Sequence, residues 1–320
     1  MGIGIRKMLG RHASGVFWMF RYLERCENTA RLLDAGFRIA SSNFNRASAD
    51  WESALDTIGI KSLFFSKYEE LSPNAVQNFI MRDKINPSSI FVSIENAREN
   101  ARMVRTVLTR EVFEAVNETY LLLKELFRRP VTEKNFPNVL ETIKRQIFFV
   151  RGALHGTMLR NDIYIFSRLG TYIERADNTA RIMDVKYYVL LPAINFIGSS
   201  VDNAQWESIL RSVSAYQSYK WLNEESINPR GICKYLILDE RFPRSLLFCT
   251  RTLSSNIKNL VITYEREDKS ADLIQKITKK LENGRIEQIF DKGLHEFISS
   301  FLSDIKRISS QIENDFRFND

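Results

Sequence analysis

The sequence predicts an all-α protein, a helical bundle built from two tandem helical repeats related by a pseudo-twofold axis. Three observations lead to this prediction. The 320 residues include only 13 glycines and 7 prolines, so few chain-breaking residues interrupt the helices. Apolar or small residues recur at alternating spacings of three and four, as at Cys26, Ala30, Leu33 and Phe37, whereas strand-like alternation is not evident. A charged segment of the first half also recurs in the second half.

The internal repeat defines the expected organisation. Residues 22–34 (YLERCENTARLLD) align without gaps with residues 172–184 (YIERADNTARIMD), and both contain the dipeptide Glu-Arg. Further matches follow in the same order: 51–55 with 206–210, Asp83 with Asp239, and 87–90 with 243–246. We therefore expect a first helical repeat over residues 1–157 and a second over residues 158–320, which together make one domain.

Individual helix boundaries follow from capping residues and chain-breakers. A polar cap or a first-turn proline predicts helix starts at Ser72-Pro73, Pro87-Ser88 and 135–137, and Ser245 is placed to cap another helix. Breaks are expected near Gly59, Gly198 and Asn283-Gly284. The last stretch, residues 285–316, is expected to form a helix that packs across the body.

The bulk composition excludes several classes of protein. The net charge is +7 with a pI near 9.2, but basic residues are scattered among acidic ones, so a nucleic-acid partner is not expected. Three cysteines without Cys-x-x-Cys spacing argue against a disulfide framework and a thiolate metal site, and favour a reducing cytoplasm. No signal peptide is recognised, and no apolar run approaches the ~20 residues that span a bilayer, so no membrane partner is expected.

The repeated segment places acidic, amide and guanidinium side chains on one face of a helix. At 100° per residue this face lies away from the apolar stripe. It consists of Glu24, Glu27, Asn28, Arg31 and Asp34 in the first copy, and of Glu174, Asp177, Asn178, Arg181 and Asp184 in the second.

Three interpretations of this face remain open. The first is a solvated face with i,i+4 ion pairs worth ~0.2–0.5 kcal/mol each. The second is a buried structural network in which loss of one partner costs ~3–5 kcal/mol. The third is a site for an anionic ligand. The polar identities are kept between the copies while apolar positions differ, as in Leu33 and Met183. This favours the latter two, with Arg31 and Arg181 expected to bind carboxylates across the pseudo-twofold axis.

Other arginines complete the set of candidates. Arg98, Arg102 and Arg105 are spaced to line one helix face, with Ala97, Ala101 and Leu108 on another, and Arg244 lies in a turn before Ser245. The substrate- or partner-binding candidates are Glu24, Glu27, Asn28, Arg31, Arg98, Arg102, Glu174, Asn178, Arg181 and Arg244, and no residue is assigned a catalytic role.

Familiar catalytic signatures are absent from the sequence. The residues three positions before the histidines are Leu9, Gly152 and Lys292, so the Glu-x-x-His pairs of di-iron bundles are missing. Phosphate-binding glycine loops, the His-Glu-x-x-His helix and the Gly-x-Ser-x-Gly elbow are also missing. Cys26 lies on the apolar stripe, where a buried thiol is common. We expect no cofactor and no metal.

With these residues in view, the chain resembles the bacterial alpha-E family of helical proteins. The resemblance covers nearly the full length: Met8-Leu9, 22–34, 88–90, 97–102, Glu111, Glu114, Asn117, 156–158, Arg160, Asp162, 172–184 and 242–245. The chain departs from the family pattern at Cys26, Phe113 and Ile163-Tyr164. The resemblance implies a genetic setting beside, or fused to, circularly permuted ATP-grasp proteins and transglutaminase-like peptidases.

This setting implies a role in making or processing a peptide or amide bond. The leading hypothesis is an accessory or scaffolding subunit of an ATP-grasp ligase system that binds the ligase or its anionic substrate through the Glu/Arg helix faces. One alternative is an enzyme that uses Glu24 and Glu174 as acid or base, with arginines holding the substrate. Another is a purely structural helical adaptor.

Overall fold

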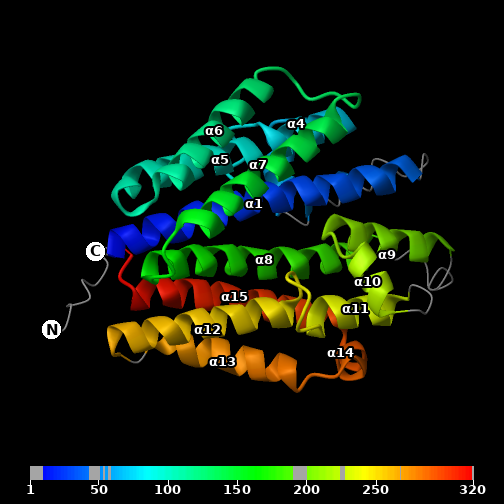
Figure 1. The fold of residues 1–320 in the computed structure, drawn as a ribbon. Coiled ribbons are helices and arrows are strands. Elements are labelled where there is room, and N and C mark those ends of the chain that lie inside the picture. The colour runs from blue at the N-terminus through cyan, green and yellow to red at the C-terminus, as the bar shows by residue number, and fades with distance from the viewer. Residues whose placement is uncertain are drawn as a thin grey trace.

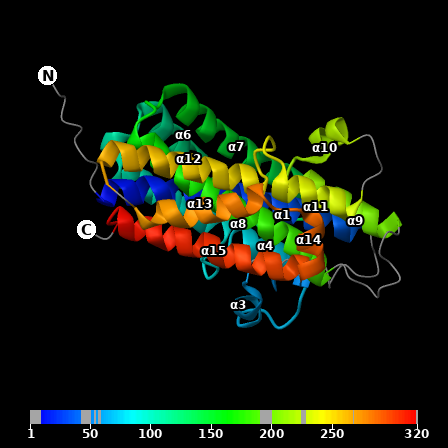
Figure 2. The same cartoon turned by 90° about the horizontal axis from the view of Figure 1, so that it is seen from below.

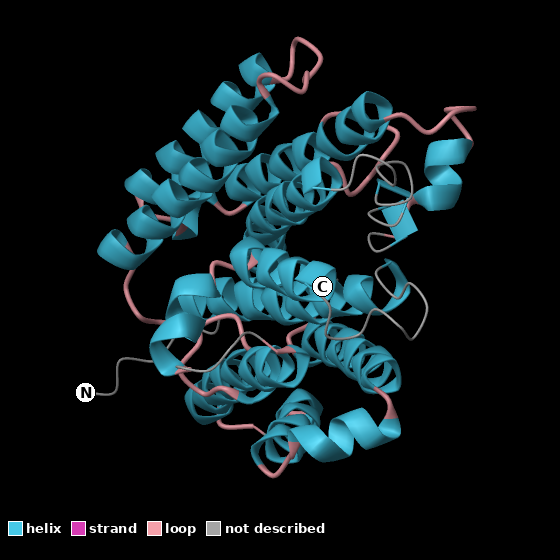
Figure 3. Cartoon of the chain, turned by 90° about the vertical axis from the view of Figure 1, so that its right-hand side faces the viewer, coloured by secondary structure: helices cyan, strands magenta, loops and turns pink. Residues whose placement is uncertain are grey.

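The computed structural model describes residues 10–42, 51–52, 55–56, 59–189, 200–223, 228–266 and 268–318. All regular structure within these ranges is helical (Figure 3), which confirms the all-α prediction. The break expected at Gly198 lies outside the described residues.

Two long helices occupy the centre of the molecule. Helix α1 (Gly10–Ser42) and helix α8 (Asp162–Val189) pack side by side, and the other helices lie around them (Figure 1). The predicted apolar stripe of α1 is buried, since Cys26, Ala30 and Leu33 are fully covered. The repeated Glu-Arg segments belong to these two helices, so the fold brings both copies into the same interior.

The first half adds a layer on one side of α1. It contains α3 (Lys61–Phe65), α4 (Pro73–Met81), α5 (Ile90–Met103), the 3-10 turn Arg105–Val107, α6 (Arg110–Leu126) and α7 (Phe136–Thr157). Helices α5 and α7 pack on α1, and α6 bridges α5 and α7 (Figure 1).

The second half covers α8 from the opposite side. It contains α9 (Ser200–Ser212), α10 (Tyr216–Leu222), α11 (Pro229–Leu238), α12 (Leu246–Tyr264), α13 (Lys269–Glu282), α14 (Ile286–Lys292) and α15 (Leu294–Asp315). Helices α12 and α15 pack on α8, and α13 packs on both of them (Figure 2). The chain returns to the start of α1, where the Phe318 ring lies 5.4 Å from the Phe17 ring.

Helix starts follow the predicted capping chemistry. The hydroxyls of Ser72 and Ser245 accept hydrogen bonds from the backbone N–H groups of Ala75 and Phe248, as expected for N-caps. In the predicted start at Pro87-Ser88, the cap is one residue later: Ser89 accepts from the N–H of Val92. Helix α7 begins at Phe136, with a proline in its first turn.

One predicted helix is divided in two. Residues 285–316 do not form a single helix, because Gly293 adopts a φ of 97° between α14 and α15. This region of backbone conformation suits glycine and ends a right-handed helix. The apolar spacing continues across the glycine, so periodicity alone does not reveal the break. As predicted, α15 packs on the body, against α8 and α13.

Across the described part of the chain, no helix combines the length and the apolar character that crossing a membrane requires.

Candidate functional site

The two repeated Glu-Arg segments exchange ion pairs between α1 and α8. Arg175 of α8 donates to both oxygens of Glu24 on α1, at 2.9 Å and 3.1 Å. Arg25 of α1 donates to both oxygens of Glu174 on α8, at 2.5 Å and 3.0 Å. Each arginine therefore forms a bidentate pair with the glutamate of the other segment, and two-point contacts of this kind fix orientation as well as energy.

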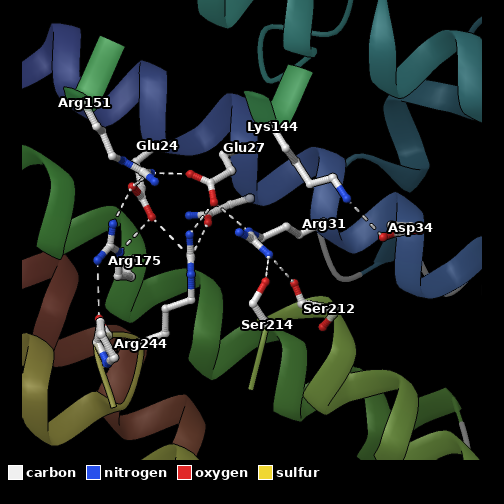
Figure 4. Close-up of polar contacts among 12 residues, drawn as sticks. Glu24, Glu27, Arg31, Asp34, Lys144, Arg151, Arg175, Ser212, Ser214 and Arg244 are labelled. Carbon is white, nitrogen blue, oxygen red and sulfur yellow. Dashed lines mark hydrogen bonds and ion pairs between the residues drawn. The ribbon is translucent and has the colours of Figure 1, made fainter. Parts of the chain in front are cut away.

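A larger group of charged side chains surrounds Glu24, and we call it the buried network. Arg151 of α7 pairs with both Glu24 and Glu27 (Figure 4). Arg244, from the turn before α12, donates to Glu27 at 2.6 Å and lies 3.3 Å from Glu24. The network consists of Glu24, Glu27, Arg31, Arg151, Arg175 and Arg244.

Arg31 and Asn28 extend the buried network to neighbouring backbone. Arg31 donates to Glu27 at 2.7 Å, to the Ser212 carbonyl at 3.2 Å and to the Ser214 hydroxyl at 2.7 Å (Figure 4). The Asn28 side chain accepts from Arg244 at 2.9 Å and donates to the backbone carbonyl of Glu174 at 3.4 Å. Asn28 therefore connects the surroundings of Glu24 with those of Glu174.

The glutamates of the buried network are held as carboxylates. Glu24 is 1% exposed and Glu27 is 0% exposed. Burial alone raises the pKa of Glu24, but the charges of Arg151, Arg175 and Arg244 outweigh it, so that pKa lies below its ordinary value. Burial likewise raises the pKa of Glu27, and Arg244, Arg151 and Arg31 lower it further than burial raises it.

Positive charge exceeds negative charge in the buried network, since four guanidinium groups face two carboxylates. Burial and the neighbouring charges of Arg31 and Arg175 lower the pKa of Arg244 to about 10, against the attraction of Glu27 and Glu24. Arg175 responds in the other direction, because its pairing with Glu24 outweighs the effect of burial and raises its pKa.

The second Glu-Arg segment borders a pocket. Besides its pair with Arg25, Glu174 accepts from Arg21 at 3.1 Å, and Arg21 also donates to Ser309 of α15 at 2.9 Å. Burial raises the pKa of Glu174, but the two arginines lower it to about 2. Glu174 is thus a carboxylate at neutral pH and lies in the pocket wall.

The pocket, which we call the α1–α8–α15 pocket, has a volume of about 650 Å³. This lies within the ~300–1,000 Å³ range of ordinary small-molecule sites. Its wall carries both signs of charge, with basic groups from all three helices and acidic groups from α8 and α15. The polar lining residues are Arg21, Arg25, Asn28, Thr29, Ser88, Glu174, Asp177, Asn178, Arg181, Ser303, Lys306, Ser309, Ser310 and Glu313.

One buried polar atom in the α8 wall of the pocket has no hydrogen-bond partner within the described part of the chain. Arg181 donates to Asp177 one turn earlier, at 2.7 Å and 3.2 Å. The buried atom is the side-chain oxygen of Asn178, for which the residues that the structure describes supply no hydrogen-bond donor. A buried acceptor without a hydrogen bond destabilises the folded protein, so a ligand that donates a hydrogen bond to this oxygen would be bound favourably.

The structure brings together eight of the ten predicted residues. Glu24, Glu27, Asn28, Arg31 and Arg244 meet in or beside the buried network, and Glu174, Asn178 and Arg181 line the pocket. Arg98 and Arg102 lie elsewhere. Arg98 donates to Asn117 at 2.8 Å and covers the ring of Tyr120 at 4.3 Å, while Arg102 is exposed on α5.

Two details of the prediction are corrected. Arg31 does not cross to a carboxylate of the other segment: it pairs with Glu27 of its own helix, and Arg25 and Arg175 make the crossing pairs. The arginine face of α5 is also shorter than predicted, because the helix ends at Met103. Arg105 and Leu108 therefore lie beyond the helix.

Sequence reasoning missed four arginines. Arg25 and Arg175 lie outside the polar helix face predicted from the sequence. Both copies of the repeated segment have arginine at this position, and this identity is a signal that could have identified them. Arg21 and Arg151 gave no such signal, because Thr171 stands opposite Arg21 in the alignment and Arg151 lies outside the repeated segment. Only the packing of α7 on α1 places Arg151 beside the glutamates.

The three cysteines lie in the hydrophobic core. Cys26, Cys233 and Cys249 are buried free thiols, and burial raises the pKa of each. Among the residues that the structure describes, no group of three or more histidine, cysteine, aspartate or glutamate side chains is arranged to hold a metal ion.

The architecture is thus that of an all-helical domain whose interior is joined by paired Glu-Arg dipeptides. The chain belongs to the Alpha-E family, whose model matches residues 8–316 and is described as a predicted alpha-helical domain with a conserved ER motif. The Glu-Arg dipeptides at 24–25 and 174–175 are the ones that exchange ion pairs. No curated protein and no solved structure matches the chain.

Proposed function

We propose that this protein is a non-catalytic binding subunit of an ATP-grasp amide- or peptide-ligase system. In this proposal the α1–α8–α15 pocket holds the carboxylate or phosphate end of the ligase's substrate. The observation that carries it is the pocket itself, with Arg21, Arg25, Arg181 and Lys306 on its wall. Guanidinium and ammonium groups are the side chains that bind such anions. The partners are a circularly permuted ATP-grasp protein and, in a processing role, a transglutaminase-like protein.

The state of the glutamates favours binding over catalysis. A general acid or base works best when its pKa lies near the working pH. Glu174 has a pKa of about 2, and the pKa of Glu24 is also lowered. Both carboxylates are occupied by two or more arginines. They are suited to hold neighbouring arginines in place and poorly suited to transfer protons, which weighs against the enzyme hypothesis that uses them.

The pocket also favours binding over a purely structural adaptor. The buried network is sufficient to join α1, α7, α8 and the turn before α12. A chain that served only as a scaffold would gain stability from filling the neighbouring 650 Å³ with side chains. An open volume with a charged wall is the arrangement of a ligand site.

We further infer that the two halves, residues 1–157 and 158–320, are copies of one helical unit. Matching local structures support this. Asp83 and Asp239 each accept a hydrogen bond from the backbone N–H two residues later, at 3.0 Å and 2.8 Å. Ser89 and Ser245 cap the helices that follow. The aligned pairs Trp51 with Trp206 and Leu55 with Leu210 are buried in both halves.

A reconstitution experiment tests the proposed function. The chain is purified alone and together with the ATP-grasp protein of its gene neighbourhood, and nucleotide-dependent amide formation is measured with mixtures of amino acids. We expect a stable complex and a change in ligase activity when the chain is added. Absence of both effects would contradict the proposal.

Matched variants locate the effect. Arg25→Ala removes a basic group from the pocket wall, whereas Arg102→Ala removes an exposed arginine of α5 outside the pocket. The first is expected to weaken the effect on ligase activity and the second to leave it unchanged. Equal behaviour of the two folded variants would rule out the pocket as the binding site.

A further inference from the structure

The buried network shows how this fold holds a guanidinium group. Arg244 donates to Asn28 at 2.9 Å and to Glu27 at 2.6 Å, and it lies 3.3 Å from Glu24. The Arg244 guanidinium is thus bound by three acceptor groups on one face of α1, which are two carboxylates and one amide oxygen. This combination of acceptors matches the planar, forked donor geometry of arginine.

The same acceptors recur on α8, but the arginine does not. In the alignment of the repeated segments, Glu174, Asp177 and Asn178 correspond to Glu24, Glu27 and Asn28. The residue that corresponds to Arg244 is Ser88, which is small and lines the α1–α8–α15 pocket.

The acceptor that Arg244 satisfies in one segment is unsatisfied in the other. The side-chain oxygen of Asn28 accepts from Arg244, whereas the buried side-chain oxygen of Asn178 has no hydrogen-bond partner among the residues of ranges 10–42, 51–52, 55–56, 59–189, 200–223, 228–266 and 268–318. Asp177 and Glu174, which line the same pocket, are already paired with arginines of the chain. A carboxylate has about four lone-pair sites, so each can accept a further donor, as Glu27 does from both Arg31 and Arg244.

We propose that the α1–α8–α15 pocket binds the guanidinium group of an arginine-like ligand, in the place that corresponds to Arg244. This inference rests on the proposed function and names its substrate class, a zwitterion that carries a guanidinium and a carboxylate. Asn178 and Asp177 hold the guanidinium, and basic groups such as Arg21 and Lys306 hold the carboxylate. The mixture of charges on the pocket wall suits such a zwitterion better than a simple anion.

Isothermal titration calorimetry on the full chain tests this assignment with three probes. L-Arginine carries both charged ends, agmatine lacks the carboxylate, and L-citrulline replaces the guanidinium with a neutral group of similar shape. We expect L-arginine to bind, agmatine to bind more weakly, and L-citrulline to bind about tenfold or more weakly, because a charge-assisted hydrogen bond is lost. Equal binding of L-arginine and L-citrulline, or no binding of L-arginine, would overturn the proposal.

Two variants and a control locate the site. Ser88→Arg places an arginine where Arg244 stands in the other segment, so it is expected to abolish L-arginine binding and to raise the melting temperature. Asn178→Ala is expected to weaken binding about tenfold or more. Ser255→Arg adds an arginine to the exposed surface of α12 and should change nothing. If Ser88→Arg does not fold, Asn178→Ala decides, since unchanged affinity in that variant contradicts the assignment.

The two proposals fail separately. If L-arginine does not bind but the chain still changes ligase activity, the guanidinium assignment is wrong and the proposed function stands. If L-arginine binds at Asn178 and no ligase responds to the chain, the site stands and the proposed function is wrong.

Discussion

The two Glu-Arg segments have nearly the same sequence and different surroundings. Around Glu24, arginines from α7, α8 and the turn before α12 fill the space, and Glu24 is 1% exposed. Around Glu174, two arginines of α1 hold the carboxylate, and beyond them the pocket opens. One segment is an internal cross-link and the other is a pocket wall.

Two positions account for this difference. The Arg244 side chain occupies the position beside Glu27. Its counterpart in the alignment is Ser88, whose small side chain leaves the equivalent position beside Asp177 open to the pocket. Arg151 of α7 adds a further cation beside Glu24, next to Arg175 and Arg244. The repeated segment thus supplies a common framework, and the residues packed against it decide between a filled core and an open pocket.

The largest effect is expected in acid. The pKa of Glu24, of Glu27 and of Glu174 is lowered in the folded protein, so each carboxylate adds stability that is complete above its ordinary pKa of 4.5. That stability is lost as the pH falls toward the folded pKa, which is about 2 for Glu174. The free energy of unfolding, measured by urea titration from neutral to acidic pH, should fall steeply below about pH 4.5. In Glu174→Gln the fall should be shallower, and an unchanged slope would contradict this assignment.

Removing single glutamates comes next. Glu24→Ala removes the carboxylate of Arg175 and leaves Arg151 and Arg244 to share Glu27, so buried positive charge is uncompensated. The free energy of unfolding is expected to fall by about 3–5 kcal/mol. Glu174→Ala leaves Arg21 and Arg25 beside a pocket that solvent can enter, so a loss of about 1–2 kcal/mol is expected. Urea unfolding of the two variants side by side measures this, and a larger loss in Glu174→Ala would reverse the comparison.

Asn28 connects the two regions and should have an intermediate effect. In Asn28→Ala, Arg244 loses an acceptor and the backbone carbonyl of Glu174 loses a donor. A loss of about 1–3 kcal/mol is expected, because these groups remain buried. Thermal and urea unfolding of the variant provide the measurement, and a neutral substitution would show that the two regions are independent.

The smallest effect is expected at an arginine outside both regions. Arg102 is exposed on α5, so Arg102→Ala should change the free energy of unfolding by less than about 0.5 kcal/mol. The same urea titration applies. A substantial loss would mean that α5 contributes to the charged interior in a way that its exposed position does not indicate.

The sequence predicts the helices and the residues of the charged helix faces, because both depend on local spacing, but it leaves open whether those faces are buried. Ser72 and Ser245 were recognisable as caps, and Glu24, Glu27 and Asn28 as one face of a helix. Tertiary packing determined the rest. The direction in which Arg25 and Arg175 reach depends on the crossing of α1 and α8, and the place of Arg151 depends on how α7 packs on α1. The local sequence pattern does not determine how these helices pack against one another.

A pair of double-mutant cycles distinguishes the buried cross-link from the pocket wall. One cycle combines Glu24→Ala with Arg175→Ala, the other combines Glu174→Ala with Arg25→Ala, and the coupling in each is obtained from free energies of unfolding. We predict a coupling of about 2–3 kcal/mol for the buried Glu24–Arg175 pair and about 1 kcal/mol for the Glu174–Arg25 pair at the pocket. Equal couplings, or a larger one for Glu174–Arg25, would contradict the division into a buried cross-link and a pocket wall.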